Sequence, residues 1–118
     1  MKHDDIINYH ESGLASWYTV PKRKKARTAT GELFNPKALT AAHRTLPFMS
    51  VVKVKAYHNN KEVKLIINDR GPFKSNRIID VSEGAAEALD FKRLGVTKVS
   101  VEYLPDESAK LKAKLCQN

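Results

Sequence analysis

Residues 64–82 read KLIINDRGPFKSNRIIDVS, with two short apolar runs on either side of a Gly-Pro pair. The runs, 65–67 and 78–81, are rich in β-branched residues and predict two buried strands, which the Gly-Pro pair would join through a tight loop. The first run leads into Asn68-Asp69-Arg70, which brings an amide, an acid and a guanidinium to one rim of a sheet or barrel. Such a rim is a place where chemistry is expected.

The rest of the chain adds strands and little helix. Alternating or β-branched patterns predict further strands at 13–20, 51–57, 62–67 and 96–104. Ser82 with an acid after it predicts an N-capped helix over 83–90, and the Asn-Pro pair at 35–36 predicts a helical turn over 37–42. Five or six short strands with so few helices between them favour a small closed barrel over a doubly wound sheet.

Length and charge limit the protein class. A chain of 118 residues predicts one domain, which we expect over 12–105, after a flexible arm at 1–11 and before a charged tail at 106–118. The 21 Lys and Arg exceed the 13 Asp and Glu, for a formal net charge of +8. A surface of this sign attracts nucleic acid, anionic lipid headgroups or an anionic cell-wall polymer. The basic run 22–27 fits either a solvated loop or a polyanion-binding patch.

Composition excludes several kinds of site. The single cysteine, Cys116, excludes a disulfide scaffold and a cysteine zinc site. No window approaches the roughly 18 apolar residues of a membrane span, and the first residues lack the apolar core of a secretory signal. From these features alone we expect a cytosolic protein or one whose signal has been removed. No set of His, Asp and Glu has metal-ligand spacing, so neither a metal nor another cofactor is expected.

Four polar residues are candidates for chemistry. Asp69 is the strongest, because it follows an apolar strand and precedes a turn that exposes it, although a turn residue paired with the next guanidinium fits the same position. Asp80 fits a structural role better, either at the start of the following helix or paired with a nearby arginine. Judged alone, His43 and Glu32 fit ordinary polar groups of the surface or core.

Six blocks of the sequence resemble the RlpA (rare lipoprotein A) family in order and spacing. They are GLASWY at 13–18, TATGE at 28–32, LTAAHRTLP at 39–47, NDRGPF at 68–73, RIIDVS at 77–82 and the alanine pair at 85–86. The resemblance extends from Gly13 to Leu104 and is highly specific. The chain departs from the family pattern at Thr19, where a glycine is usual, and in the basic run at 22–27.

The resemblance implies a six-stranded double-psi β-barrel, a fold also found in expansins and in some inverting endoglucanases. It implies a septal peptidoglycan lytic transglycosylase, located in the periplasm or cell envelope, that acts as a monomer on glycan strands lacking stem peptides. An alternative from another class is a non-catalytic, expansin-like module that binds or loosens the wall. A nucleic-acid binder is remote, because no helix-turn-helix pattern or aromatic strand motif is present.

The resemblance also implies roles for particular residues. The catalytic acid of the family matches Asp69, its catalytic-site histidine matches His43, and its glutamate in the Thr-Ala-x-Gly-Glu block matches Glu32. One carboxyl group can protonate the leaving oxygen and then help the 6-hydroxyl of the sugar attack C1, which closes a 1,6-anhydro ring. Because the substrate supplies the nucleophile, no second carboxylate is needed for that purpose. Candidates for substrate contacts are Tyr18, Trp17, Asn68 and Arg70.

Overall fold

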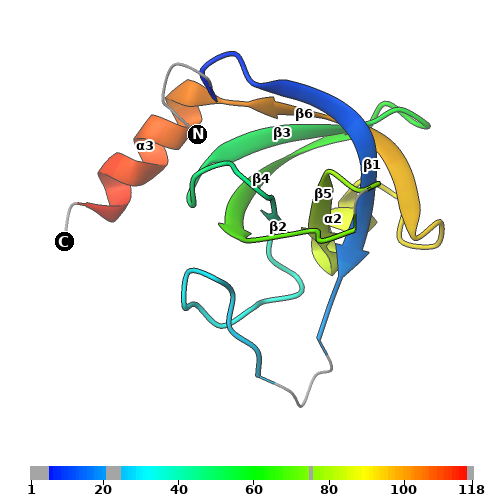
Figure 1. Ribbon diagram of the computed structural model, residues 1–118, viewed down its shortest axis with the longest axis horizontal. Coiled ribbons are helices and arrows are strands. Elements are labelled where there is room, and N and C mark those ends of the chain that lie inside the picture. The colour runs from blue at the N-terminus through cyan, green and yellow to red at the C-terminus, as the bar shows by residue number, and fades with distance from the viewer. Residues whose placement is uncertain (1–5, 21–24, 75, 117–118) are drawn as a thin grey trace.

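The computed structural model describes residues 6–20, 25–74 and 76–116, and six strands in this part of the chain close into a barrel (Figure 1). The bounds are β1 His10–Tyr18, β2 Thr40–Ala42, β3 Val51–Ala56, β4 Glu62–Asp69, β5 Ile79–Ser82 and β6 Val96–Tyr103. Around the barrel the order is β1-β5-β2-β4-β3-β6. The pairs β1–β5 and β2–β4 are parallel, and the others are antiparallel. The predicted closed, mainly β barrel of six strands is confirmed.

Strand β2 lies between the two strands of segment 64–82, so these strands are not neighbours. Ala41 of β2 pairs with Ile67 of β4 on one side and with Val81 of β5 on the other. The chain therefore leaves β4, passes β2 and returns as β5 on its far side. This crossing brings the ends of three strands to one region of the barrel.

The segment before β2 is a turn, so the prediction of a helical turn over 37–42 is wrong. The side-chain oxygen of Asn35 accepts a hydrogen bond from the Lys37 N–H at 3.0 Å, and the Ala38 N–H donates to the Asn35 carbonyl at 3.1 Å. An asparagine side chain bonded in this way forms an Asx turn, which competes with helix formation. The chain then enters β2, which pairs with a strand on each side.

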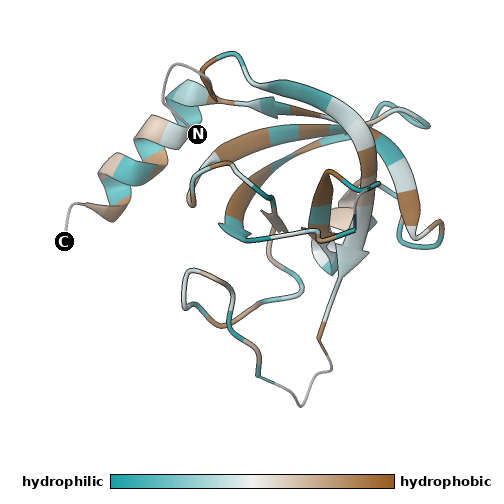
Figure 2. Cartoon of the chain, viewed as in Figure 1, coloured by the Kyte–Doolittle hydropathy of each residue, from teal (hydrophilic) through white to brown (hydrophobic). Residues whose placement is uncertain are grey.

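Aliphatic side chains fill the inside of the barrel. Figure 2 shows hydrophobic and hydrophilic residues alternating along β3, where Val52 and Val54 are fully buried while Lys55 is exposed. Ile67, Val81, Val99 and Val101 are also fully buried. Burial of each such side chain contributes about 1.5–3 kcal/mol. The core is thus a rigid frame, and the alternate residues point outward, where a ligand can reach them.

Helix α2 (Glu83–Ala88) follows β5 and confirms the predicted helix after Ser82. The Ser82 hydroxyl oxygen accepts a hydrogen bond from the Ala85 N–H at 3.2 Å, as an N-cap does. Gly84 approaches the turn before β2 so closely that a Cβ there would lie 2.6 Å from the Lys37 carbonyl oxygen. A larger residue at 84 would push the helix away from this turn.

The N-terminal residues contact the barrel. Strand β1 begins at His10, three residues before the start predicted at 13, and Ile6 is buried in the core with 3% of its surface exposed. Part of the segment predicted as an arm therefore packs on the domain. Residues 21–24, which hold three of the five basic residues of the run 22–27, lie outside the described residues.

Part of the predicted C-terminal tail is helical. Helix α3 (Pro105–Leu115) projects from the barrel in Figure 1. Its first turn is anchored by Ser108, whose hydroxyl oxygen accepts a hydrogen bond from the Val51 N–H at 2.8 Å. Neither α2 nor α3, the helices of the described part of the chain, is long and apolar enough to cross a membrane.

Candidate active site

Two carboxylates lie on the outer face of the barrel, one on each side of strand β2. Ala42 pairs with Asp69 of β4 and with Asp80 of β5, and Asp80 pairs in turn with Ser16 of β1. A register shift in β4 brings Asp69, rather than Asn68, opposite Ala42, and such bulges re-aim side chains. Ala15 and Ile79, which precede Ser16 and Asp80, are fully buried in the core, while Ser16, Asp80 and Asp69 are each partly exposed, so this row faces outward.

Asp69 is held by one of its two carboxylate oxygens. Its Oδ1 accepts hydrogen bonds from the Ala29 N–H at 3.0 Å and from the Arg70 N–H at 2.9 Å. Among the described residues, Oδ2 has no hydrogen-bond partner. The carboxylate is thus oriented by the backbone and keeps one oxygen available for a ligand. This arrangement fits the catalytic role predicted for Asp69 better than a simple ion pair with Arg70.

Glu32 lies in the loop that holds Asp69, but in the described structure its carboxylate forms no hydrogen bond with Asp69. The loop is closed by hydrogen bonds from the Thr28 N–H to the Glu32 carbonyl at 2.8 Å and from the Gly31 N–H to the Thr28 carbonyl at 2.9 Å. The exposed Glu32 side chain accepts a hydrogen bond from the Thr30 hydroxyl at 3.0 Å. The loop reaches Asp69 through the N–H of Ala29, which the sequence did not single out.

His43 is fixed at its backbone and at its ring. Its N–H donates to the Asp69 carbonyl at 3.1 Å, so the two residues are neighbours through the backbone. The residue is buried, with 3% of its surface exposed, and its Nδ1 accepts hydrogen bonds from the N–H groups of Thr45 and Leu46, both at 3.1 Å. Because Nδ1 accepts, the neutral ring carries its proton on Nε2.

The Nε2 side of the ring faces the start of β1. It lies 3.0 Å from the Tyr9 hydroxyl, which donates to Glu11 Oε1 at 2.6 Å. Burial lowers the pKa of His43 to about 4, so the ring is neutral at neutral pH. In the described part of the chain no hydrogen bond joins this ring to the Asp69 carboxylate. Tyr9 lies in the segment predicted as an arm, and no signal in the sequence indicates its contact with His43.

Arg70 is occupied by structural contacts, and Asn68 is not. The Arg70 Nη1 donates to the carbonyls of His43 at 3.3 Å and Leu46 at 2.9 Å, and its guanidinium lies 3.9 Å from the centroid of the Phe48 ring. Arg70 therefore fastens the end of β4 to the loop after β2. Asn68 is 8% exposed, and its buried Oδ1 has no partner in the described structure.

Tyr18 ends strand β1 next to both carboxylates. Its ring stacks on Phe34 with centroids 4.7 Å apart, and its hydroxyl is buried without a hydrogen-bond partner in the described structure. Burial raises the pKa of Tyr18, and the negative charges of Asp69 and Asp80 raise it further. The phenol therefore stays protonated at neutral pH and is a free donor close to the two acids. Its neighbour Phe34 was not singled out from the sequence.

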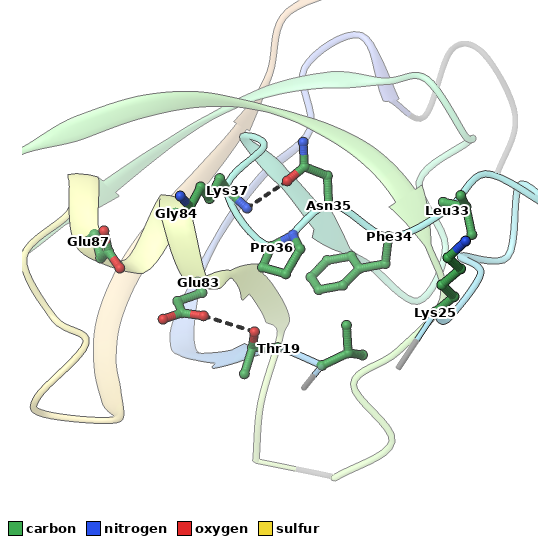
Figure 3. Close-up of a pocket in the computed structure, with 11 residues that line it drawn as sticks. Thr19, Lys25, Leu33, Phe34, Asn35, Pro36, Lys37, Glu83, Gly84 and Glu87 are labelled. Carbon is green, nitrogen blue, oxygen red and sulfur yellow. Dashed lines mark hydrogen bonds between the residues drawn. The ribbon is translucent and has the colours of Figure 1, made fainter. Parts of the chain in front are cut away.

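Pockets lie on both sides of Tyr18 along β1. One, of about 460 Å³, is lined by Ser16, Trp17, Pro72, Phe73, Lys74, Arg77, Asp80 and Val96. The Trp17 indole N–H donates to the Lys92 carbonyl at 3.1 Å, which fixes the ring in the wall of this pocket. The other pocket, of about 740 Å³, lies between α2 and residues 33–37 (Figure 3). There the Thr19 hydroxyl donates to Glu83 Oε1 at 2.8 Å and ties the end of β1 to α2.

The closed barrel, with its parallel pairs β1–β5 and β2–β4, is a double-psi β-barrel, as predicted. The chain belongs to the lytic transglycolase family, whose model matches residues 10–101. The predicted relationship to RlpA is confirmed. Endolytic peptidoglycan transglycosylase RlpA of Rickettsia typhi is 54% identical over 109 residues, which are 91% of this chain and 34% of that protein. RlpA of Campylobacter jejuni is 47% identical over 92 residues, which are 78% of this chain and 33% of that protein.

The chain spans about a third to a half of the length of its curated relatives; the match to Rickettsia felis RlpA covers 46% of that protein. Solved structures share the fold at low identity. The Streptomyces papain inhibitor superposes with a TM-score of 0.67 at 21% identity, over 85% of this chain and 99% of that one. An expansin of Clavibacter michiganensis gives 0.65 at 15% identity, over 81% of this chain and 50% of that one.

Proposed function

We propose that this domain is an endolytic peptidoglycan lytic transglycosylase that cleaves the β-1,4 bond between N-acetylmuramic acid and N-acetylglucosamine and leaves 1,6-anhydro ends. The observation that carries the proposal is the Asp69 carboxylate, which the N–H groups of Ala29 and Arg70 hold through Oδ1 while Oδ2 has no partner in the described structure. An oriented carboxyl group with one accessible oxygen on an open face is what acid and base catalysis requires. The name shared by the RlpA relatives supports the substrate class.

Asp69 performs both proton transfers in turn. In its protonated form it gives its proton to the glycosidic oxygen as the bond from C1 to that oxygen breaks. The resulting carboxylate then takes the proton of the 6-hydroxyl group as the oxygen of that group bonds to C1. The carboxyl group is restored, no water is consumed, and the product is a 1,6-anhydro ring.

His43 and Glu32 support Asp69 in different ways. His43 is a positioning residue, because its N–H holds the Asp69 carbonyl at 3.1 Å while its neutral ring is fixed to Thr45 and Leu46. Glu32 is exposed at the rim of the loop that supplies the Ala29 N–H, where it is free to contact sugar hydroxyl groups. Neither side chain is needed as a proton donor in the reaction above.

The surroundings of the enzyme follow from the same proposal. A net charge of +8 favours a glycan that carries lactyl carboxylates, and long-range attraction of this kind weakens as salt is added. Action on peptidoglycan places the domain in the periplasm or cell envelope. We expect a monomer that needs no metal or other cofactor and prefers strands poor in stem peptides.

The test is to identify the product. Wild-type protein and the Asp69→Asn variant are incubated with denuded glycan and with intact sacculi, and released fragments are analysed by mass spectrometry. We expect wild type to release fragments ending in 1,6-anhydro-N-acetylmuramic acid, faster from denuded glycan. Fragments with ordinary reducing ends would indicate hydrolysis instead. Binding to sacculi with no release from either substrate would establish the non-catalytic, expansin-like alternative.

The Tyr18→Phe variant tests whether the unpartnered hydroxyl serves the ligand. Its removal breaks no hydrogen bond in the described structure, so we expect the free energy of unfolding to stay within about 1 kcal/mol of wild type. Affinity for denuded glycan is expected to fall about fivefold to tenfold, the worth of one hydrogen bond. Chemical denaturation and binding to labelled glycan measure the two quantities. A large loss of stability with unchanged affinity would make the hydroxyl structural.

A further inference from the structure

Asp80 lies on the same outer face as Asp69, on the other side of strand β2. Both residues pair with Ala42, one from each neighbouring strand. Two strand spacings separate their Cα atoms by about 9–10 Å. Glycosidases commonly use two carboxyl groups that flank the glycosidic bond. The barrel therefore presents two acids on one face, one on each side of Ala42.

The contacts of Asp80 are not those of a structural anchor. The sequence suggested a role at the start of α2 or a pairing with an arginine, but Ser82 caps α2, and Asp80 forms no ion pair in the described part of the chain. Instead the Ser16 hydroxyl donates to Asp80 Oδ1, while Oδ2 has no partner there. Asp80 thus repeats the arrangement of Asp69, with one oxygen held and the other available. A half-buried carboxylate without a countercharge costs stability, which a purely structural role would not explain.

Tyr18 lies close enough to both acids to feel their charges. The negative charges of both Asp69 and Asp80 raise the pKa of its phenol, in addition to the larger effect of burial, so the hydroxyl lies within the field of both carboxylates. Its oxygen is buried and has no partner in the described structure. A buried donor without a partner near these acids is able to bond an oxygen of a bound ligand.

Asp80 also borders the pocket of about 460 Å³, which is lined in part by residues 72–74 of the loop that follows Asp69. The walls of this pocket include the Trp17 indole and the Phe73 ring, which is 89% exposed. The Nε of Arg77, also in the wall, is buried without a partner in the described structure. Aromatic faces with a few convergent polar groups are typical of ligand sites. A sugar seated here would have Asp80 beside it.

We propose that Asp80 is a second catalytic carboxylate, whose negative charge stabilises the positive charge that develops at C1 while Asp69 carries the proton. The proposal rests on the proposed lytic transglycosylase function and adds an electrostatic role to it. No bond to Asp80 forms and no proton moves to it. The oxocarbenium-like transition state of glycosidic cleavage carries a positive charge that the substrate in its ground state lacks. A negative charge at Asp80 therefore stabilises the transition state more than the substrate.

The test compares Asp80→Asn, Asp80→Glu and the exposed control Asp106→Asn, by release of anhydro fragments and by binding to denuded glycan. The amide oxygen of Asp80→Asn can still accept from Ser16, so we expect the variant to fold. Its kcat is expected to fall about 10²–10³-fold, with KM and glycan binding within about threefold of wild type, because the charge acts in the transition state. Asp80→Glu keeps the charge and is expected to retain at least about tenfold more activity, and Asp106→Asn full activity.

Other results would overturn the proposal. Wild-type kcat in Asp80→Asn would show that the charge is not used. Equal inactivity of Asp80→Asn and Asp80→Glu, both folded by circular dichroism, would show that shape rather than charge matters. A loss confined to KM and glycan binding would make Asp80 a binding residue only. In each case an active wild type and an inactive Asp69→Asn would leave the proposed function standing, whereas an inactive wild type would remove that function itself.

Discussion

Replacement of Asp69 by asparagine is expected to lower the rate of 1,6-anhydro product formation by about 10³-fold or more. The amide cannot give a proton to the leaving oxygen and cannot take one from the 6-hydroxyl group, so both transfers are lost. Its side-chain oxygen can still accept from the N–H groups of Ala29 and Arg70, which hold Oδ1 in the wild type. The fold and the position of the side chain are therefore expected to persist.

The Asp69→Asn variant is informative because it is expected to lower the rate of product formation without lowering glycan binding. Binding to denuded glycan and the thermal midpoint are expected to stay close to wild type, and the exposed Asp106→Asn variant on α3 serves as the control for removing one negative charge. Initial rates on purified glycan, followed by quantifying anhydro ends, give the comparison. Residual activity within tenfold of wild type would assign the proton transfers to another group.

Most of the barrel is predictable from the sequence because its strands carry their own signal. β3, β4 and β6 alternate or are β-branched over six to eight residues, and each was predicted close to its observed bounds. β2 has three residues, Thr40–Ala42, which is too short for any period to show. It is a strand because β4 and β5 pair with it on both sides. The residues of these partner strands lie 25 to 40 positions further along the chain, so the local sequence of β2 does not reveal them.

The candidate site is predictable only in part, for a similar reason. Asp69 is found from its place at the end of an apolar run, whereas His43 and Glu32 rest on the resemblance to RlpA. The ring of His43 is hydrogen-bonded to Tyr9, which lies 34 residues earlier in a segment without a periodic pattern, so the sequence does not reveal this contact. Asp80 was interpreted as structural because it stands just before a helix. Ser82 is the residue in the N-cap position, and pairing with Ala42 places Asp80 on the outer face.

The second large effect concerns stability in acid, and it follows from the burial of His43. Burial lowers the pKa of this ring from an ordinary 6.5 to about 4, with Glu11 opposing and Arg70 and Arg44 reinforcing the shift. In the unfolded chain the His43 ring therefore binds a proton near pH 6.5, whereas in the folded protein it binds one only near pH 4. The free energy of unfolding should fall by about 1.4 kcal/mol per pH unit within this window, or about 3 kcal/mol in total.

Comparison with a His43→Asn variant isolates this contribution. Asparagine does not titrate. Its side-chain oxygen can occupy a position close to that of the His43 Nδ1 and accept hydrogen bonds from the N–H groups of Thr45 and Leu46. We expect the variant to be less stable than wild type at pH 7, because the contact with Tyr9 is lost, but to lose less stability on acidification. Denaturant unfolding at pH 7, 5.5 and 4 measures the difference, in which the carboxylates common to both proteins largely cancel. If the free energy of unfolding depended on pH in the same way in both proteins, the His43 ring would accept a proton in the folded state at its ordinary pKa. The buried, neutral His43 that positions Asp69 through the backbone would then not be the form present in solution.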